Sequence, residues 1–278
     1  MMKTKNRSRL CSTVLLVLAQ ASLTHSLAAG DYAPAAGQPG SEAIAMNDSS
    51  IVAWATSVES LVRGPQDISN AESALASYGS GDNALGAAQG TSGGVVSLGD
   101  GGSITLGFDN PIYNGEGFDF AVFENGFSDT FLEFAFVEVS SNGSDFFRFE
   151  ADYAPVSAPP SQIGGFGSVD TTEYDNLAGK YKQGYGTPFD LAELEGIADL
   201  DINNIVAIRI VDVVGSLDAS YGSTDKDGDL INDPYATPFS SGGFDLDAIG
   251  VMHAVPEPQT YAALLGLVAL AISLMRRR

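Results

Sequence analysis

The sequence predicts an all-β fold, namely a jelly-roll-like β-sandwich with one short helix, and three observations support this. From Gly93 onward, apolar residues recur in short runs with a period near two, which is typical of half-buried strands. Gly-rich segments separate these runs and supply turns. Residues 205–214 (IVAIRIVDVV) form a nearly continuous β-branched run, as expected of a central strand. No repeat of fixed period appears, so a propeller or solenoid is not expected.

The first part of the chain gives weaker structural signals. Residues 29–92 are rich in Ala, Gly, Pro and Ser, and they are predicted to form a lead-in that packs on the sandwich. Within this segment, residues 51–63 (IVAWATSVESLVR) fit either a short helix or a strand and a turn. Trp54 is the single Trp of the chain and lies in this apolar stretch, so we expect it in the core rather than on a sugar.

The sandwich core is predicted over residues 93–253, and its turns indicate two hairpins. Gly99-Asp100-Gly101-Gly102 joins the runs 95–98 and 103–108. Ser141-Asn142-Gly143-Ser144 joins 134–140 to 145–149, and Asn-Gly is a strong hairpin signal because both residues accept positive φ.

Three further segments complete the predicted core. Residues 118–123 (FDFAVF) are apolar on both strand faces, so both faces should be buried, with Asp119 accepting from loop amides. Residues 244–252 are the last strand. The one helical signal lies at 188–198, where Asp190 is the expected N-cap and Glu193 follows three residues later.

The N-terminus is predicted to be a secretory signal peptide over residues 1–28, removed by signal peptidase after Ala28. It has four basic residues, then an apolar run from Leu10 to Leu18, then the small-x-small sequence Ser26-Leu27-Ala28. An N-terminal anchor helix is the alternative, although the apolar run is short for one.

The C-terminus, residues 254–278, has three parts in order. These are Val255-Pro256-Glu257-Pro258, an apolar run over 261–275 that is short for a membrane-spanning helix, and Arg276-Arg277-Arg278. This tail resembles the PEP-CTERM sorting signal of exported bacterial proteins. The resemblance implies a hydrophobic helix that holds the chain transiently in the inner membrane until an exosortase-type enzyme releases it to the cell surface or extracellular matrix. A plain C-terminal anchor is the alternative.

Removing both signals sharpens what the composition excludes. Taking seven of the 13 basic and one of the 35 acidic residues away leaves six and 34 over residues 29–255, a formal charge of −28. Such a segment is not expected to bind nucleic acid. It has no Cys and one His, His253, which excludes thiol nucleophiles and multi-His metal sites. We assign no catalytic residue and expect His253 to be an edge residue.

The sharpest motif is the acidic segment 225–234, DKDGDLINDP. Its predicted oxygen ligands suit Ca²⁺, as a structural cofactor that clamps the 216–242 connection: Asp225, Asp227, Asp229, the carbonyl of Ile231, and Asp233. The run resembles the loops of thrombospondin type 3 and EF-hand-like sites. It departs from the EF-hand pattern at Leu230, where Gly is usual, and at Ala236, where a bidentate Glu is usual. A solvated acidic loop is the alternative.

Several other polar residues allow either a purely structural or a functional interpretation. Asp245 and Asp247 form either a polar outer face or a second acidic site, with Phe244, Leu246 and Ala248 facing the core. Arg209 interrupts the most apolar strand and should pair with an acidic neighbour. Five tyrosines in loop-like segments either pack the loops down or stack on sugars: Tyr153, Tyr174, Tyr181, Tyr185 and Tyr221.

Four core segments, 101–127, 134–143, 178–194 and 241–251, resemble a family of exported bacterial cell-surface proteins. That resemblance implies a β-sandwich surface domain without a defined reaction. The sequence therefore favours a non-enzymatic, calcium-stabilised surface or matrix protein that binds extracellular polysaccharide or another surface polymer. The alternatives are a carboxylate-based glycoside hydrolase or lyase, and a purely structural surface component.

Overall fold

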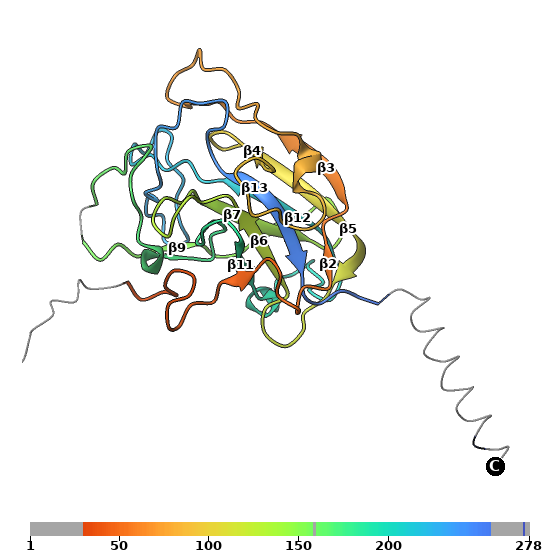
Figure 1. The fold of residues 1–278 in the computed structure, drawn as a ribbon. Helices are drawn as coiled ribbons and strands as arrows, with labels where there is room; N and C mark the ends of the chain where they lie inside the picture. The colour runs from red at the N-terminus through yellow and green to blue at the C-terminus, as the bar shows by residue number, and fades with distance from the viewer. Residues whose placement is uncertain (1–29, 158–159, 257–274, 276–278) are drawn as a thin grey trace, which may run out of the picture.

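The computed structural model describes residues 30–157, 160–256 and 275, and it places the strands in two facing antiparallel sheets (Figure 1). One sheet has the order β1 (Ile44–Ala45), β11 (Tyr185–Phe189), β6 (Phe120–Glu124), β13 (Asp245–Val251) and β2 (Ala53–Trp54), with β4 (Val96–Ser97) also on β13. The other has the order β3 (Ser57–Val62), β5 (Ser103–Ile112), β12 (Ile205–Asp212), β7 (Ala135–Ser140) and β8 (Phe147–Arg148). The all-β prediction is confirmed.

Short elements decorate the two sheets. A small separate sheet pairs β9 (Asp152–Tyr153) with β10 (Tyr174–Asp175). Between residues 30 and 256, the described helices are 3₁₀ turns, namely η1 (Gly81–Ala84), η2 (Thr171–Glu173) and η3 (Leu191–Leu194). In the same part of the chain, no helix has the length and apolar character needed to cross a membrane. The predicted signal peptide and most of the predicted tail, including its apolar run and Arg cluster, lie outside the described residues.

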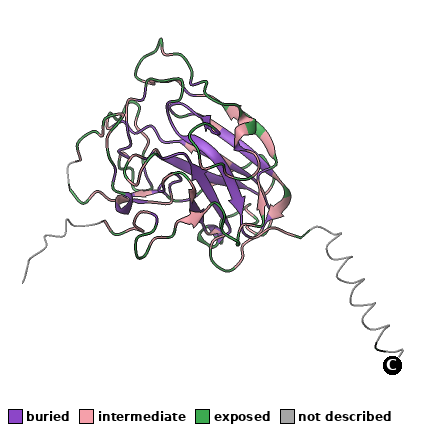
Figure 2. Ribbon diagram, in the orientation of Figure 1, coloured by how far each residue is buried: buried purple, intermediate pink, exposed green. Residues whose placement is uncertain are grey.

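The core lies between the two sheets, where the inward faces of the strands meet (Figure 2). Phe120 of β6 stacks on Phe189 of β11 with ring centroids 5.3 Å apart, and both rings are fully buried. Ile208 and Ile210 of β12 enter the same cluster, while Arg209 between them faces outward, as the two-residue period of a strand requires. Aligned sheets with interdigitated inner faces form a β-sandwich.

The strongest strand predictions are confirmed. The β-branched run forms β12, which is central in its sheet between β5 and β7. The Asn-Gly turn connects β7 to β8 as an antiparallel hairpin, with Gly143 at φ +76°. Residues 118–123 are buried on both faces, since Phe120 belongs to the inter-sheet core and Phe123 to a second cluster on the opposite face.

The hairpin predicted at 99–102 is wrong. β4 pairs with β13 in one sheet, whereas β5 pairs with β3 and β12 in the other, so the turn carries the chain between sheets. Contacts across the sandwich hold this turn: the Gly101 N–H donates to Asp212 Oδ2 at 2.9 Å, and a Cβ on Gly99 would overlap Gly64 O. The Gly-rich tetrapeptide forms a local bend. The sheet that β5 joins after this bend is determined by pairing with strands far away in the sequence.

The lead-in and the predicted helix take particular local forms. Residues 51–63 adopt the strand alternative, and β1, β2 and β3 add edge strands to both sheets. The predicted helix is shorter than residues 188–198, because β11 extends to Phe189 and only η3 follows. Asp190 is its N-cap, accepting from the Ala192 N–H at 2.8 Å.

Candidate functional site: a polar groove beside the Asp225 loop

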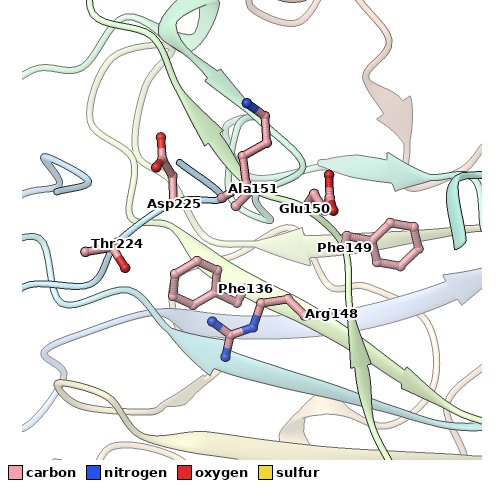
Figure 3. A pocket seen from close by; sticks show the side chains of 8 residues that line it. Phe136, Arg148, Phe149, Glu150, Ala151, Thr224 and Asp225 are labelled. Atoms are coloured by element: carbon pink, nitrogen blue, oxygen red, sulfur yellow. The ribbon is translucent and has the colours of Figure 1, made fainter. Parts of the chain in front are cut away.

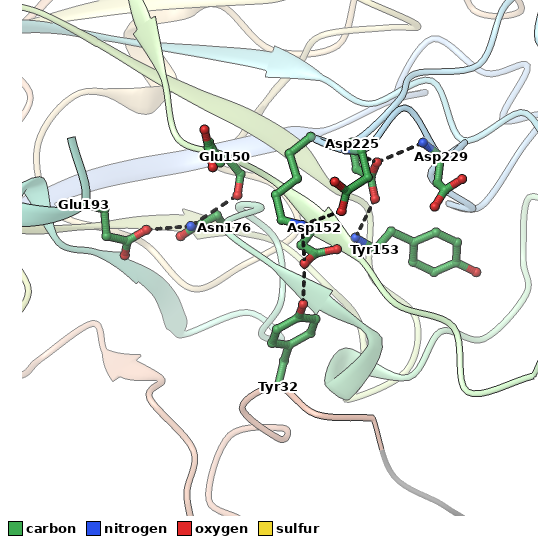
Figure 4. Close-up of polar contacts among 10 residues, drawn as sticks. Tyr32, Glu150, Asp152, Tyr153, Asn176, Glu193, Asp225 and Asp229 are labelled. Carbon is green, nitrogen blue, oxygen red and sulfur yellow. Dashed lines mark hydrogen bonds and ion pairs between the residues drawn. The ribbon is translucent and has the colours of Figure 1, made fainter. Parts of the chain in front are cut away.

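The acidic segment forms a tight turn organised by Asp225. Thr224 and Leu230 pair as a β-bridge, and the Asp225 N–H donates to Asp229 O at 2.9 Å. The Asp225 carboxylate accepts the Asp227 and Asp229 N–H groups at Oδ1, both at 2.9 Å, and the Tyr153 N–H at Oδ2 at 3.1 Å (Figure 4). Asp225 therefore caps its own loop and ties it to β9.

The other predicted calcium ligands do not converge on this carboxylate. Asp227 pairs with Lys226 at 2.5 Å, and Asp229 is exposed. Asp233 is buried and accepts the Phe134 N–H at 3.1 Å, while the Ile231 N–H donates to Ser223 O at 3.0 Å. Over residues 30–157 and 160–256, no three His, Cys, Asp or Glu side chains are grouped to hold a metal. The calcium site stays a prediction.

Asp245 and Asp247 are both buried rather than on a solvated outer face. Asp245 accepts from the Ser97 hydroxyl and, at 3.1 Å, from the Asn125 amide. Asp247 accepts the Gln89 and Gly90 N–H groups at 3.0 and 2.8 Å. The expected orientation of Ala248 is wrong, because a register shift between Leu246 and Ala248 turns Ala248 away from the inter-sheet core that holds Leu246.

A groove of two adjoining hollows, each of about 360 Å³, lies beside the Asp225 loop. Arg148, Glu150 and Lys226 line both hollows, so we treat them as one groove. Figure 3 shows Arg148, Glu150 and Asp225 around the first hollow. The second hollow continues past Asn176 and Glu193. The volume of each hollow is within the range of small-ligand sites.

Polar contacts fix the groove walls. Lys226 Nζ lies 3.0 Å from Asp152 Oδ2, which also accepts the Tyr32 hydroxyl at 2.6 Å (Figure 4). The hydrogen bond from Tyr32 lowers the pKa of Asp152, and the contacts with Asp227 and Asp152 raise the pKa of Lys226. Lys226 and Asp152 are therefore charged at neutral pH and present both signs to a ligand.

The far end of the groove holds an acid beside an amide. Asn176 donates to Glu193 Oε2 at 2.6 Å and to the Glu150 carbonyl at 3.3 Å. Desolvation raises the pKa of Glu193 above its ordinary value. Sequence reasoning missed this groove, since its residues come from five separate segments. The scarcity of basic residues is the one sequence feature that points to the groove. Only six lie between 29 and 255, and two of them, Arg148 and Lys226, line it.

The predicted acidic partner of Arg209 is confirmed as Glu138 on β7. Glu138 Oε2 accepts from Arg209 Nε at 2.6 Å, and Oε1 accepts from Arg148 Nε at 2.9 Å. Each guanidinium also covers a phenylalanine ring, Phe146 for Arg209 and Phe136 for Arg148, at about 4 Å. The cluster fixes Arg148 at the groove.

His253 and two of the five tyrosines predicted in loops, Tyr153 of β9 and Tyr174 of β10, have structural contacts. His253 Nδ1 lies 2.7 Å from the fully buried Asp119, whose carboxylate also accepts the Gly115 and Leu191 N–H groups at 2.7 Å each. The expectation that Asp119 satisfies loop amides is therefore confirmed. Tyr153 and Tyr174 stack at 4.9 Å, and both are buried, so they pack the small β9–β10 sheet onto the cluster that holds Phe134.

Comparison with known families indicates where the protein is sent in the cell. Residues 254–278 match the PEP-CTERM protein-sorting motif. The fold and this motif define an exported, β-rich cell-surface protein. Its C-terminal motif is the sorting signal that exosortase-type enzymes process. Comparison with curated proteins finds no match. At the start of the motif, Val255 adds its N–H to Pro111 O at 2.9 Å, so the sandwich ends where the sorting signal begins.

Proposed function

We propose that this protein is a non-enzymatic component of the cell surface or extracellular matrix that binds extracellular polysaccharide in the groove beside the Asp225 loop. The single observation behind the proposal is the polar groove itself, where Arg148, Lys226 and Asn176 stand among carboxylates. Donors and acceptors held in fixed positions suit a hydroxyl-rich chain. The signal peptide and the hydrophobic tail would pass the protein through the inner membrane before release.

Charge narrows the class of polymer. The segment 29–255 carries −28, so an acidic polysaccharide is repelled unless a divalent cation bridges the two. Neutral polymers escape this repulsion. Binding of neutral chains should therefore be independent of calcium, while binding of acidic chains should require it.

The test is a glycan-array screen of the full-length chain with calcium and with chelator, followed by Lys226→Ala. Lys226 is exposed in the groove, so its removal should weaken binding with little effect on folding. Lys182→Ala, which breaks an exposed ion pair with Asp129 outside the groove lining, is the matched control. Equal binding by wild type and Lys226→Ala would contradict a role for the groove. No binding to any glycan would favour the purely structural alternative.

Calcium at the Asp225 loop is a proposal of its own. Asp225, Asp227 and Asp229 project from one turn, and Lys226 is the cation beside them, so a divalent ion would relieve their repulsion. Binding would have to share the Asp225 oxygens with the backbone amides they now accept. Calcium should raise the melting temperature, and Asp227→Ala should abolish the rise. Equal melting in calcium and in chelator would refute it.

A glycoside hydrolase or lyase is the second candidate, and Glu193 is the observation that favours it. Its pKa is raised, and the groove is also lined by the carboxylates of Glu150, Asp152 and Asp175, so it has the residue types that a general acid and a partner carboxylate require. Release of reducing ends from polysaccharide that disappears in Glu193→Gln would establish this activity. Binding without turnover would support the non-enzymatic function.

A further inference from the structure

Four phenylalanines from three loops form a continuous row on the surface, which we call the Phe row. Successive ring centroids are 5.5 Å apart from Phe127 to Phe131, 6.3 Å from Phe131 to Phe166, and 5.6 Å from Phe166 to Phe239. Phe127, Phe166 and Phe239 are 62%, 77% and 45% exposed. Neighbouring rings therefore lie next to one another, and Phe127 and Phe166 still offer most of their area to solvent, which is unusual for large apolar side chains.

The loops that carry the Phe row are fixed to one another. The Phe131 N–H donates to Ser128 Oγ at 2.9 Å, and the Val169 N–H donates to Thr130 O at 2.8 Å, joining the first loop to the second. The Tyr235 N–H donates to Ile163 O at 3.1 Å, joining the second to the third. The exposed rings therefore stand on a preorganised surface.

The shape of the row points to an extended ligand. Phe131 and Phe166 lie with their planes 12° apart at a centroid distance too large for direct face contact, so they present neighbouring and nearly parallel faces. The spacing along the row is close to the length of one sugar unit in an extended polysaccharide.

The exposed area of the Phe row argues against a second copy of the chain as its partner, and the charge of the protein argues against a membrane surface. The exposed parts of three Phe side chains amount to roughly 350–400 Å², given about 200 Å² for a whole side chain. A stable dimer interface needs about 800 Å² per partner. A membrane surface is also a poor fit, because anionic headgroups attract basic segments, whereas residues 29–255 carry −28.

We propose that the Phe row is a stacking platform for a neutral polysaccharide chain, a second binding surface distinct from the groove. The proposal rests on the proposed function, since it presumes that the protein binds extracellular polysaccharide.

The test uses affinity electrophoresis of the full-length chain in gels that contain hydroxyethyl cellulose, laminarin or galactomannan. Phe166→Ala should weaken the retardation about tenfold in apparent affinity, as expected for loss of one stacked ring. Phe166→Leu should weaken it too, whereas Phe166→Trp should retain or strengthen it. Tyr221→Ala removes a 38% exposed aromatic ring outside the row and should change nothing. Phe166 is so exposed that the melting temperature should stay constant.

Each result decides between the two proposals. Retardation of the wild type that is lost in Lys226→Ala and unchanged in Phe166→Ala would overturn the Phe row and leave the groove. Full binding by Phe166→Leu would also overturn stacking, because a leucine keeps the apolar surface without the ring. If none of the three neutral polysaccharides retards the wild type, the Phe row proposal fails, while the glycan array with calcium and with chelator decides the groove. Self-association or vesicle binding that depends on Phe166, without retardation by any polysaccharide, would overturn the proposal and show that the Phe row binds a protein or a membrane instead.

Discussion

Single residues at the outer face of β7 carry more electrostatic weight than the surface charge suggests. Glu138 is 7% exposed and is the shared partner of Arg148 and Arg209, both of which keep about a third or more of their side chains in solvent. An isolated surface ion pair contributes little, but one carboxylate shared by two guanidiniums forms a small network in which each contact supports the other.

Glu138→Gln should therefore lower the free energy of unfolding by about 1–2 kcal/mol, because two guanidiniums lose their charged acceptor while solvent screens part of the loss. Urea denaturation measures this. Asp129→Asn breaks the more exposed pair with Lys182 and should cost less than about 1 kcal/mol. Equal losses in the two variants would show that the shared carboxylate has no special role.

The sequence predicted that Arg209 has an acidic partner but could not name Glu138. The pairing depends on the register of β12 on β7, which sets Arg209 opposite Glu138. The same limit applies at Asp245 and Asp247, whose spacing indicates one strand face, whereas the bulge between Leu246 and Ala248 and the loop at Gln89 bury both. Local spacing predicts a side chain's face only while the strand is regular.

At the scale of elements, the sequence predicted a turn correctly where that turn joins two consecutive strands of one sheet. The turn between β7 and β8 has Gly143 at φ +76°, and a Cβ there would meet no atom within 4 Å. Gly143→Ala should therefore destabilise by about 1 kcal/mol through backbone strain alone. Gly93→Ala is the control, since a Cβ there also has open space and no positive φ opposes it. Chemical denaturation should show the control unchanged or slightly stabilised.

Turns that leave a sheet were not readable in the same way. The 99–102 tetrapeptide has hairpin composition, yet it delivers β5 to the other sheet because β4 finds Asp245 and Leu246 as partners. The groove is hidden for a similar reason: Arg148, Asn176, Glu193 and Lys226 come together through the pairing of β9 with β10 and the docking of the Asp225 loop on β9. Such long-range pairings leave no mark in composition or spacing.

For the whole molecule, the surplus of acid reaches the interior as well as the surface. Glu124, Asp212 and Asp233 are buried, and desolvation together with neighbouring carboxylates raises the pKa of each well above its ordinary value. Desolvation also raises the pKa values of Asp100 and Asp245 to about 6. Folding therefore favours the protonated form of each of these acids.

A carboxyl whose pKa is higher in the folded state binds more protons there than in the unfolded chain. Its contribution to stability is largest at low pH and is lost as the pH rises from the unfolded value near 4 through the folded value. For Asp100 and Asp245 this window closes at about pH 6. We expect the melting temperature to fall between pH 4.5 and 7 in the absence of divalent cations. Asp245→Asn, which keeps an acceptor for Ser97, should flatten the slope, whereas Asp129→Asn on the surface should leave it. A melting temperature that rises across this window would show that the buried acids are ionised in the folded protein and held by a partner.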